Sequence, residues 1–545
     1  MLVLQRSSPD YSDQSECQSI VSDPSDRTNT TALAFIVIIV GTILFRAPAF
    51  GNAAYGFDEQ LYSLIGQRWL DGLLPYTDSW DRKPPGLFAI FALSHWLGGG
   101  SALAYQIPAL AAAIAGSLLM YALARPFVTE GQSVLVALTY SLGLVLFGSG
   151  SAQSEVFFLP LLLGALLLLV VPQLSRRRAL GAMLLLGLAL QVKYTILPFC
   201  VILGLYALMR RMQQQRDALK LLQDALLFTA IGLLPTIAFC AYFMALQQFE
   251  PFWQANFVSF FKREGAGRLG IISLCAIGLL APPALGGVLT AWRSDAAALP
   301  RQYWLFCLFG LAATITVFFP GTVYLYYFAT LVPASLLAAL PLLRKCLPIR
   351  LSRQILCLAF VLVAWILAGS FQRNAADRLA LEQLTTAIQR HVDTDRCLFI
   401  YDGPAVLYRL ANACIPTRFV YPDHLNNRLE RNALGTPQVG ELAQALRSRP
   451  QVIVSTPSFV TPRGEENDRI VAAALRKEYR ALTTVVLQSR EITVWLLKSQ
   501  QSVRSSSSCE GCSVPAREPM AAYQSPDTGT HTSLRRRNGG IIGEL

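Results

Sequence analysis

Runs of apolar residues alternate with short polar segments along the chain between residues 31 and 371. Many of these runs approach the length of about twenty residues with which an α-helix crosses the hydrocarbon core of a bilayer. They predict about eleven membrane-spanning helices, at residues 32–50, 103–124, 132–150, 155–173, 178–192, 194–209, 222–246, 269–291, 303–319, 322–341 and 354–371. The pattern therefore predicts a polytopic α-helical membrane protein.

One apolar run, from Gly86 to Gly100, is shorter than the others and ends in three glycines. Its length favours an interfacial or re-entrant helix over a span. The choice sets the sidedness, because arginine-rich loops stay in the cytoplasm under the positive-inside rule. With a cytoplasmic N-terminus and a non-crossing run, the basic segments 175–178, 210–216 and 344–353 all face the cytoplasm. If the run crossed, all three would face outward, so charge favours eleven spans.

Beyond residue 372 the pattern changes to short β-rich runs and helical segments. The stretch "ALTTVVLQSREITVWLLK" predicts a hairpin with its turn near Ser489 and Arg490. We therefore expect a transmembrane domain at 31–371, with its first extracytoplasmic loop at 51–102, and a small extracytoplasmic α/β domain at 372–499. Residues 1–30 are expected to form a polar cytoplasmic tail without a cleavable signal peptide, and residues 500–545 a disordered tail.

Composition agrees with this class and excludes a water-soluble globule. Apolar residues make up 53% of the chain, charged residues 15%, and the mean hydropathy is +0.42. The net charge of +12 does not indicate nucleic-acid binding, because the basic residues lie in short clusters between apolar runs. Most of the 11 cysteines lie in or beside those runs, but Cys397 and Cys414 do not and could form a disulfide in an extracytoplasmic domain.

The first loop carries the densest group of ionisable residues. Asp58 and Glu59 stand in the first turn of a predicted amphipathic helix. Its apolar positions predict that one face lies on the membrane: Phe57, Leu61, Leu64, Ile65 and Trp69. The two carboxylates either serve chemistry or only complement the positive end of the helix dipole.

Asp81, Arg82 and Lys83 follow in the same loop, directly before Pro84-Pro85. The prolines stiffen the chain and would fix the direction of the basic residues before them. These residues either snorkel at the membrane interface or help to bind an anionic, lipid-borne substrate. Carboxylates and bases together beside a membrane favour the second interpretation.

The stretch "FDEQLYSLIGQRWLDGLLPY…WDRKPPGLFAI" resembles the first extracytoplasmic loop of the GT-C glycosyltransferases, in the branch of the protein O-mannosyltransferases and the lipid A aminoarabinose transferases. In that branch an Asp-Glu pair follows the first span, and a Lys-Pro-Pro element begins a juxtamembrane helix. The resemblance extends over about residues 30–500. "SAQSEVFFLP" is similar to a second acidic element, here Glu155, and "GLALQVKYTILP" to the stretch whose lysine contacts the lipid phosphate, here Lys193.

Two further stretches carry the resemblance. "YLYYFATLVPA" resembles a His-Tyr element, with Tyr326 where histidine is usual and Tyr327 as the following tyrosine. "YDGPAVLYRLANACIPTRFVYP" resembles the small C-terminal domain of many bacterial members, which implies a bacterial inner membrane. The substitution at Tyr326 weakens any role assigned to that position.

The resemblance implies a polyprenyl-phosphate sugar as donor and inverting transfer to an acceptor hydroxyl on the extracytoplasmic face. Asp58 would be the general base, worth about 10²–10⁴-fold in rate, and Glu59 would hold the acceptor or orient the base. The further substrate-binding candidates, with Lys193 first for the departing phosphate, are Lys193, Arg82, Lys83, Arg268, Glu155, Asp81 and Tyr327. Lys193 could instead snorkel, and Glu155 could simply be solvated at the start of a helix.

Other features leave alternatives open. Asp58, Glu59, Asp81 and Glu155 could converge on a divalent ion, but no metal or other cofactor is predicted. The aromatic and basic segment 249–268 would be a mobile lid or an interfacial anchor. A lipid-substrate transporter or a non-catalytic membrane scaffold remains the alternative function. The sugar and the acceptor, whether protein, lipid or glycan, are not identified.

Overall fold

The computed structural model describes residues 24–215, 217–265, 270–293, 302–346, 349–459 and 461–498. The tail predicted at 500–545, most of the tail predicted at 1–30, and Arg268 lie outside the described residues. The described residues belong to one compact unit.

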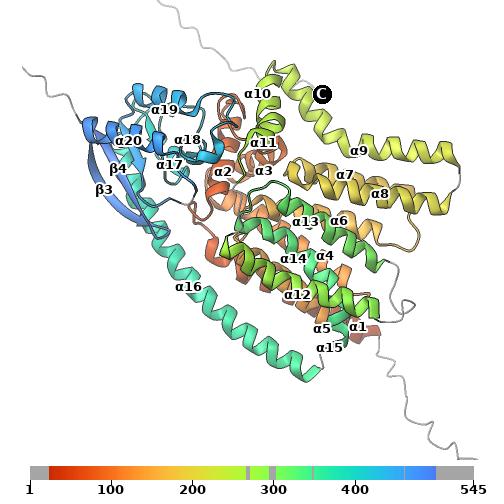
Figure 1. The fold of residues 1–545 in the computed structure, drawn as a ribbon. Helices are drawn as coiled ribbons and strands as arrows, with labels where there is room; N and C mark the ends of the chain where they lie inside the picture. The colour runs from red at the N-terminus through yellow and green to blue at the C-terminus, as the bar shows by residue number, and fades with distance from the viewer. Residues whose placement is uncertain are drawn as a thin grey trace, which may run out of the picture. The chain divides into compact units, whose positions relative to one another are not determined.

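Each predicted span falls on a helix (Figure 1). These helices are α1 (Pro24–Arg46), α4 (Leu103–Ala124), α5 (Glu130–Leu146), α6 (Ser154–Leu169), α7 (Arg176–Leu190), α8 (Leu197–Gln214), α9 (Ala218–Ala245), α12 (Ile271–Arg293), α13 (Tyr303–Phe318), the pair η5 (Leu325–Thr330) and α14 (Leu331–Ala338), and α16 (Ile349–Gln389). A short helix, α15 (Leu340–Cys346), follows α14. By length and composition, five of the described helices suffice to cross a membrane, and five more are apolar but shorter.

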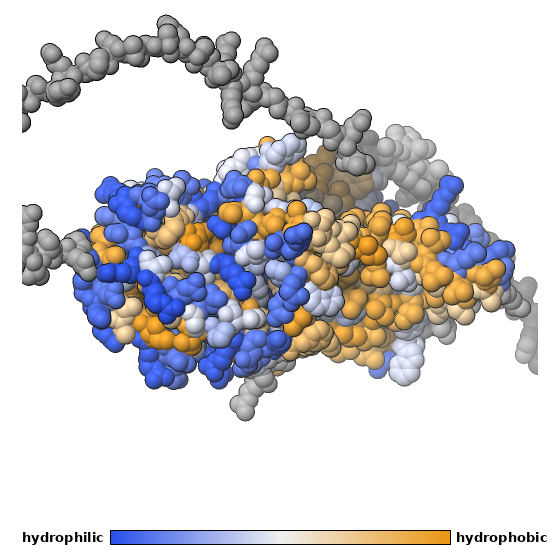
Figure 2. All heavy atoms as spheres, turned by 90° about the horizontal axis from the view of Figure 1, so that it is seen from above, coloured by the Kyte–Doolittle hydropathy of each residue, from blue (hydrophilic) through white to orange (hydrophobic). Residues whose placement is uncertain are grey.

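The outer surface of this bundle is apolar. Large side chains such as Leu33 on α1, Leu226 on α9 and Leu279 on α12 are more than half exposed. Figure 2 shows a largely hydrophobic area on one face of the molecule, beside a hydrophilic region. Such a surface is stable only in lipid, because water would be ordered against hundreds of square ångströms of hydrocarbon. The chain is therefore an integral, polytopic α-helical membrane protein, as predicted.

Two short helices, α2 (Phe57–Leu70) and α3 (Pro85–Gly98), form the first loop. α3 has 14 residues, about 21 Å of helix, which agrees with the short run predicted there. The prediction that α2 lies on the membrane is wrong, since Leu61, Leu64 and Ile65 are buried in the protein core. α2 packs instead on α3, and Gly66 allows the approach, because a Cβ there would lie 2.8 Å from the backbone nitrogen of Ala92.

The expected α/β domain is present at the C-terminal end. Its four strands are β1 (Leu398–Ile400), β2 (Val452–Ser455), β3 (Tyr479–Leu487) and β4 (Arg490–Leu497), in the order β1-β2-β4-β3. β1 and β2 are parallel and the other pairs antiparallel. Its helices are α17 (Val406–Leu410), α18 (Pro422–Asn426), η6 (Arg428–Glu430), α19 (Gln438–Arg447) and α20 (Glu465–Glu478).

Two details refine the predicted domain boundaries and turn. Helix α16 continues through residue 372, so the border expected there lies inside one unbroken helix. The β3–β4 turn is formed by Gln488 and Ser489, both with positive φ, one residue before the predicted position.

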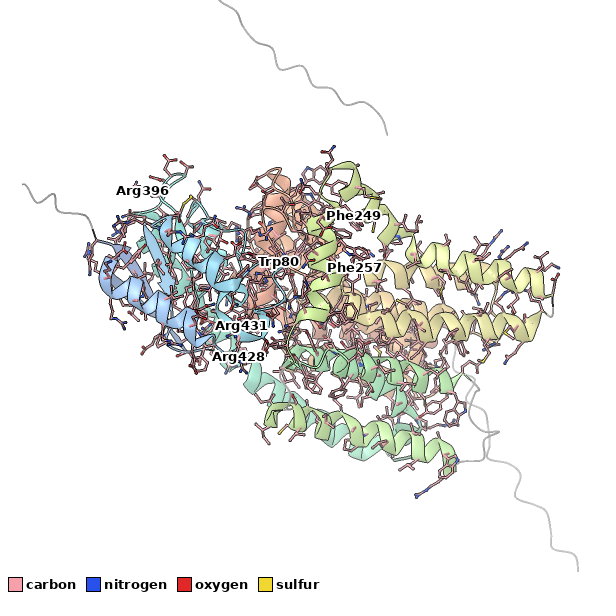
Figure 3. The ribbon with its side chains drawn as sticks, turned by 45° about the horizontal axis from the view of Figure 1, so that its top comes forward. Trp80, Phe249, Phe257, Arg396, Arg428 and Arg431 are labelled. Carbon is pink, nitrogen blue, oxygen red and sulfur yellow. A yellow bond between two sulfur atoms is a disulfide. The ribbon has the colours of Figure 1, made fainter. Side chains whose placement is uncertain are left out.

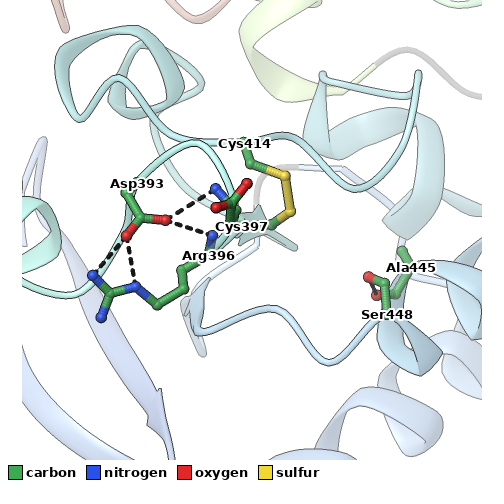
Figure 4. Close-up of a disulfide and its surroundings, with 7 residues drawn as sticks. Asp393, Arg396, Cys397, Cys414, Ala445 and Ser448 are labelled. Carbon is green, nitrogen blue, oxygen red and sulfur yellow. Dashed lines mark hydrogen bonds and ion pairs between the residues drawn. A yellow bond between two sulfur atoms is a disulfide. The ribbon is translucent and has the colours of Figure 1, made fainter. Parts of the chain in front are cut away.

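The C-terminal domain contains a disulfide between Cys397 and Cys414 (Figure 4). It joins the start of β1 to the loop after α17, where the N–H of Leu398 also donates to the carbonyl of Cys414 at 3.0 Å. Asp393 and Arg396 form an exposed ion pair beside it. The bond that the sequence left open is therefore formed in this structure.

Two of the predicted basic loops meet at one end of the bundle. Asp224 on α9 is buried and accepts from Arg176 at 2.8 Å and from Arg211 at 2.9 Å. The pairs join the start of α7, the end of α8 and the start of α9. The residues that the sequence singled out for chemistry lie near the opposite ends of these helices.

Candidate active site

A cavity of about 1000 Å³ lies where the first loop, the spans and the C-terminal domain meet. Its polar part is lined by the candidate residues Asp58, Glu59, Asp81, Arg82, Lys83, Lys193 and Tyr327. Its apolar part is lined by side chains of α8, α9 and α13 and of the segment before α12, among them Leu197, Val201, Leu233, Phe260 and Ile315. One continuous space therefore joins charged groups to a hydrocarbon-like groove.

Asp58 stands in the first turn of α2, with its carboxylate held by three donors. Tyr62 donates to Oδ2 at 3.2 Å from the next turn of the helix, and Gln153 donates to the same oxygen at 3.0 Å. Tyr421 of the C-terminal domain donates to Oδ1 at 3.1 Å. Oδ1 thus has fewer donors than Oδ2 and is the oxygen with an acceptor position left over.

Glu59 is buried, and its carboxylate binds the backbone just before α6. Its Oε2 accepts from the N–H of Ala152 at 2.7 Å, while its Oε1 has no hydrogen-bond partner within the described part of the chain. Arg46 holds the preceding residues 149–151 by donating to their three carbonyl groups. Burial raises the pKa of Glu59 to about 7, against the lowering effect of the Ala152 N–H and Arg46.

The Pro84-Pro85 pair starts α3 and places the charged residues before it. The N–H of Leu87 donates to the carbonyl of Gln191 at 3.0 Å, and a Cβ on Gly86 would lie 2.6 Å from the Cβ of Gln191. This close contact brings the Asp81–Lys83 segment to the turn that carries Lys193. Residues more than a hundred positions apart in the sequence therefore line the same space.

Asp81 is buried and accepts from the backbone N–H of Lys83 at 2.8 Å and from His424 Nε2 at 3.2 Å. Burial alone would raise the pKa of Asp81, but Lys83, His424 and Arg82 together bring it well below its usual range. Asp81 thus remains a carboxylate that fixes the turn before Lys83.

The cationic side chains predicted to bind a phosphate differ in the ion-pair partners that they have in this structure. Lys193 forms a buried ion pair with Glu155 and lies 4.0 Å above the ring of Tyr327. Arg82 pairs with Glu430 of the C-terminal domain. Lys83 has no ion pair with any described residue, and its ammonium group contacts the ring of Tyr62 at 5.3 Å. The structure therefore favours Lys83 over Lys193 as the cation that is available to a ligand.

The carboxylates do not gather as a metal site would require. In the described ranges, no group of three or more His, Cys, Asp or Glu side chains is placed to hold an ion. Asp81 binds His424, and Glu155 binds Lys193. The suggested convergence of Asp58, Glu59, Asp81 and Glu155 on one cation is therefore not formed in this structure.

The aromatic segment after α9 forms one side of the cavity. Figure 3 labels Phe249 and Phe257 on this segment. It consists of α10 (Phe249–Trp253), the π-helix η3 (Gln254–Val258) and α11 (Ser259–Lys262). Phe252 is fully buried and Phe257 stacks on Tyr194 with ring centres 5.2 Å apart. The following residues are tied to the C-terminal domain, because the N–H of Glu264 donates to the carbonyl of Leu429 at 3.1 Å.

The fold and a family match identify the class. The dolichyl-phosphate-mannose-protein mannosyltransferase family matches residues 82–239. The structure superposes on the crystal structure of ArnT from Cupriavidus metallidurans in the apo state with a TM-score of 0.57 and 14% identity, covering 86% of this chain and 98% of ArnT. The chain has the GT-C glycosyltransferase fold.

ArnT bound to undecaprenyl phosphate matches similarly, with a TM-score of 0.55, 14% identity and coverage of 87% of this chain and 98% of ArnT. No curated protein matches the chain in sequence. The predicted resemblance to the GT-C superfamily, the fold class and the assignment as a membrane glycosyltransferase are confirmed.

Sequence reasoning missed part of the cavity of this GT-C protein. Tyr421, His424 and Glu430 reach it from the C-terminal domain, and Arg263 reaches it from the segment after α11. Arg263 donates to Glu430 at 2.7 Å and to Tyr324 at 2.6 Å. The only signal in the sequence was the clustering of polar and aromatic residues in "FVYPDHLNNRLE", which does not reveal the distant partners.

Proposed function

We propose that the protein transfers a sugar from a polyprenyl-phosphate donor to an acceptor hydroxyl on the extracytoplasmic face of the membrane. The observation that carries this proposal is the single cavity that joins Asp58 and Lys83 to an apolar groove between spans. A donor of this kind has a hydrocarbon tail, a phosphate and a sugar in a row. The cavity offers a groove, a cation and a carboxylate for these three parts.

The donor phosphate would bind at Lys83, with Lys193 as a second cation of the same cavity. The ammonium group of Lys83 has no ion-pair partner among the described residues. Burial lowers its pKa, but Asp81 and Asp58 raise it above the ordinary value. Lys83 would therefore be fully charged at neutral pH. The undecaprenyl phosphate of the structurally similar ArnT complex supports a lipid phosphate as the ligand class. Lys193 would have to give up part of its pairing with Glu155 to contribute.

The transfer would be a single displacement with inversion. Asp58 Oδ1 accepts the proton of the acceptor hydroxyl while the acceptor oxygen forms a bond to the anomeric carbon. The bond between that carbon and the phosphate oxygen breaks at the same time, and its electron pair leaves with the lipid phosphate. Lys83 lowers the cost of the negative charge that grows there. The donors on Oδ2 leave Oδ1 to face the acceptor.

Two observations favour the extracytoplasmic face. The disulfide Cys397–Cys414 lies in the domain that lines the cavity, and disulfides persist in oxidising compartments. The basic residues Arg176 and Arg211 meet at the other ends of α7 and α8. By the positive-inside rule that end faces the cytoplasm, and a bacterial inner membrane is the proposed location.

Transport of a lipid substrate is less well supported. A transport pathway needs ionisable side chains along the spans. In the part of the chain that the structure describes, the buried ion pairs Glu155–Lys193 and Asp224–Arg211 lie near the two ends of the spans. A non-catalytic scaffold would not need a hydrogen-bonded carboxylate such as Asp58 in an open cavity.

Binding and transfer can be tested separately. The first measurement is the affinity of purified protein in detergent for undecaprenyl phosphate, with undecaprenol as the uncharged ligand. Lys83→Met should weaken phosphate binding about 10- to 100-fold, because a charged hydrogen bond contributes about 1.5–3 kcal/mol, and should leave undecaprenol binding unchanged. Lys262→Met, on an exposed lysine of α11, is the control. Equal affinity of Lys83→Met and wild type would exclude the proposed phosphate site.

The second measurement is release of radiolabelled sugar from polyprenyl-phosphate hexoses and pentoses. Asp58→Asn keeps the shape of the side chain but removes the base, so release should fall at least about a hundredfold. Undecaprenyl phosphate binding should remain. If wild type neither binds nor cleaves any of these donors, the proposed function is wrong; if Asp58→Asn is as active as wild type, only the assignment of the base is wrong.

A further inference from the structure

A segment of the C-terminal domain, residues 418–430, lies along the charged turn of the first loop. The N–H of Trp80 donates to the carbonyl of Arg418 at 2.9 Å. Asp81 binds His424, and Arg82 binds Glu430. Three consecutive residues of the loop are thus each bonded to this segment, which here is called the clasp segment.

The clasp segment also reaches the carboxylate proposed as the base. Tyr421 lies directly before α18, and its hydroxyl donates to Asp58 Oδ1 at 3.1 Å. The two residues are 363 positions apart in the sequence. Pro422 occupies the first helical position and restricts the backbone next to Tyr421. The tyrosine is therefore held at Asp58 by a defined piece of secondary structure.

We infer that Tyr421 is a positioning residue for the base and that the clasp segment is an essential part of the active site, an inference that rests on the proposed function. The C-terminal domain then acts in every turnover and is more than a docking platform for acceptors.

The reason lies in the rotation of the carboxylate. Tyr62 and Gln153 both bind Oδ2, and their bonds alone leave the other oxygen unrestrained. The third donor, Tyr421, fixes the plane of the group and leaves one acceptor position of Oδ1 for the substrate hydroxyl. A base that is held in the reactive orientation spends more of its time in productive geometry.

Tyr421 is suited to this task because it stays protonated. Burial, and then Asp58 and Asp423, raise the pKa of the Tyr421 phenol well above its ordinary value. The hydroxyl is therefore a donor over the whole working range of pH. It cannot compete with Asp58 for the proton of the acceptor.

The anchors of the clasp segment are independent of this hydroxyl. The His424–Asp81 bond and the pairing of Glu430 with Arg82 and Arg263 do not involve Tyr421. Removing one oxygen from Tyr421 should therefore leave the segment in place. A loss of activity in Tyr421→Phe would then report on Asp58 and not on detachment of the domain.

The test compares Tyr421→Phe with Tyr479→Phe in purified full-length protein. The Tyr479 hydroxyl donates to the carbonyl of Pro450 at 2.8 Å inside the same domain and does not line the cavity. Sugar release from the radiolabelled polyprenyl-phosphate donors gives kcat and KM, and thermal unfolding in detergent gives stability. Tyr421→Phe should lower kcat about tenfold with KM within twofold of wild type, whereas Tyr479→Phe should keep both values.

Each outcome decides between the possibilities. If kcat of Tyr421→Phe stays within twofold of wild type, the positioning role is wrong. The role is also wrong if KM rises while kcat is unchanged, since Tyr421 would then only bind substrate. It is wrong as well if the loss of kcat in Tyr421→Phe comes only together with a drop in Tm larger than that of Tyr479→Phe. A wild-type protein that cleaves no donor would overturn the proposed function and this role with it.

Discussion

Glu430 joins the clasp segment to two arginines outside it. It lies in a buried position between Arg82 and Arg263, with one oxygen 2.7 Å from the Arg263 guanidinium. Burial alone would raise the pKa of Glu430, but Arg82 and then Arg263 lower it from 4.5 to about 2. We predict that Glu430→Gln destabilises the protein and releases the clasp segment.

The magnitude follows from the pKa. A fall from 4.5 to about 2 corresponds to about 3 kcal/mol of stabilisation at neutral pH. Breaking a buried ion pair by removing one partner typically costs about 3–5 kcal/mol, which agrees. Because the folded-state pKa is lowered, this contribution is complete above about pH 4.5 and is lost progressively as the pH falls towards 2.

The assay is the free energy of unfolding in detergent at pH 7, combined with hydrogen exchange of the amides of residues 418–430. Glu466→Gln, at an exposed position of α20, is the control for the loss of one carboxylate. Glu430→Gln should lower the free energy of unfolding by about 3 kcal/mol and speed exchange in residues 418–430, while the control should change neither. A decrease below about 0.5 kcal/mol, or exchange in this segment equal to that of wild type, would refute the reasoning.

Two further predictions concern stability. The pKa of Glu59 is raised to about 7, so its neutral form is favoured on folding, and the free energy of unfolding should fall as the pH rises from about 4.5 to about 7. Glu59→Gln should remove most of this pH dependence. If the free energy of unfolding of Glu59→Gln changes with pH between 5 and 8 as steeply as that of wild type, the prediction is wrong. The disulfide joins residues 17 positions apart, and replacing Cys397 and Cys414 by serine should cost about 3 kcal/mol. Thermal unfolding with and without reductant tests this, and a wild-type Tm insensitive to reductant under conditions that cleave the bond would oppose it.

The sequence by itself determined the membrane architecture. A span must satisfy all of its backbone hydrogen bonds within one helix, so about twenty apolar residues suffice to identify it without knowledge of its neighbours. The same local logic identified the short helix α3 and the β3–β4 hairpin. The turn of this hairpin lies at Gln488 and Ser489, one residue before the predicted position. The candidate residues Asp58 and Lys83 were found because a charged, proline-rich loop is unusual beside a span.

The tertiary structure decided how these elements face one another. Helix α2 has an amphipathic pattern that suits a membrane surface, but it packs against α3 and against α17 of the C-terminal domain, and its apolar side chains, including Leu61 and Ile65, are buried. Periodicity cannot distinguish a face that meets lipid from one that meets protein, since both environments are apolar. The unbroken course of α16 through residue 372 was hidden in the same way.

Ion pairing was also decided only in three dimensions. Arg82, Lys83 and Lys193 look alike in the sequence, yet Glu430 and Glu155 bind two of them and leave Lys83 without an ion-pair partner among the described residues. The electrostatic energy of a charge depends on neighbours within a few ångströms. Those neighbours lie 348 positions away for Arg82 and 38 positions away for Lys193. The sequence could therefore name the charged groups of this site, and only the folded structure could say which of them are free to act.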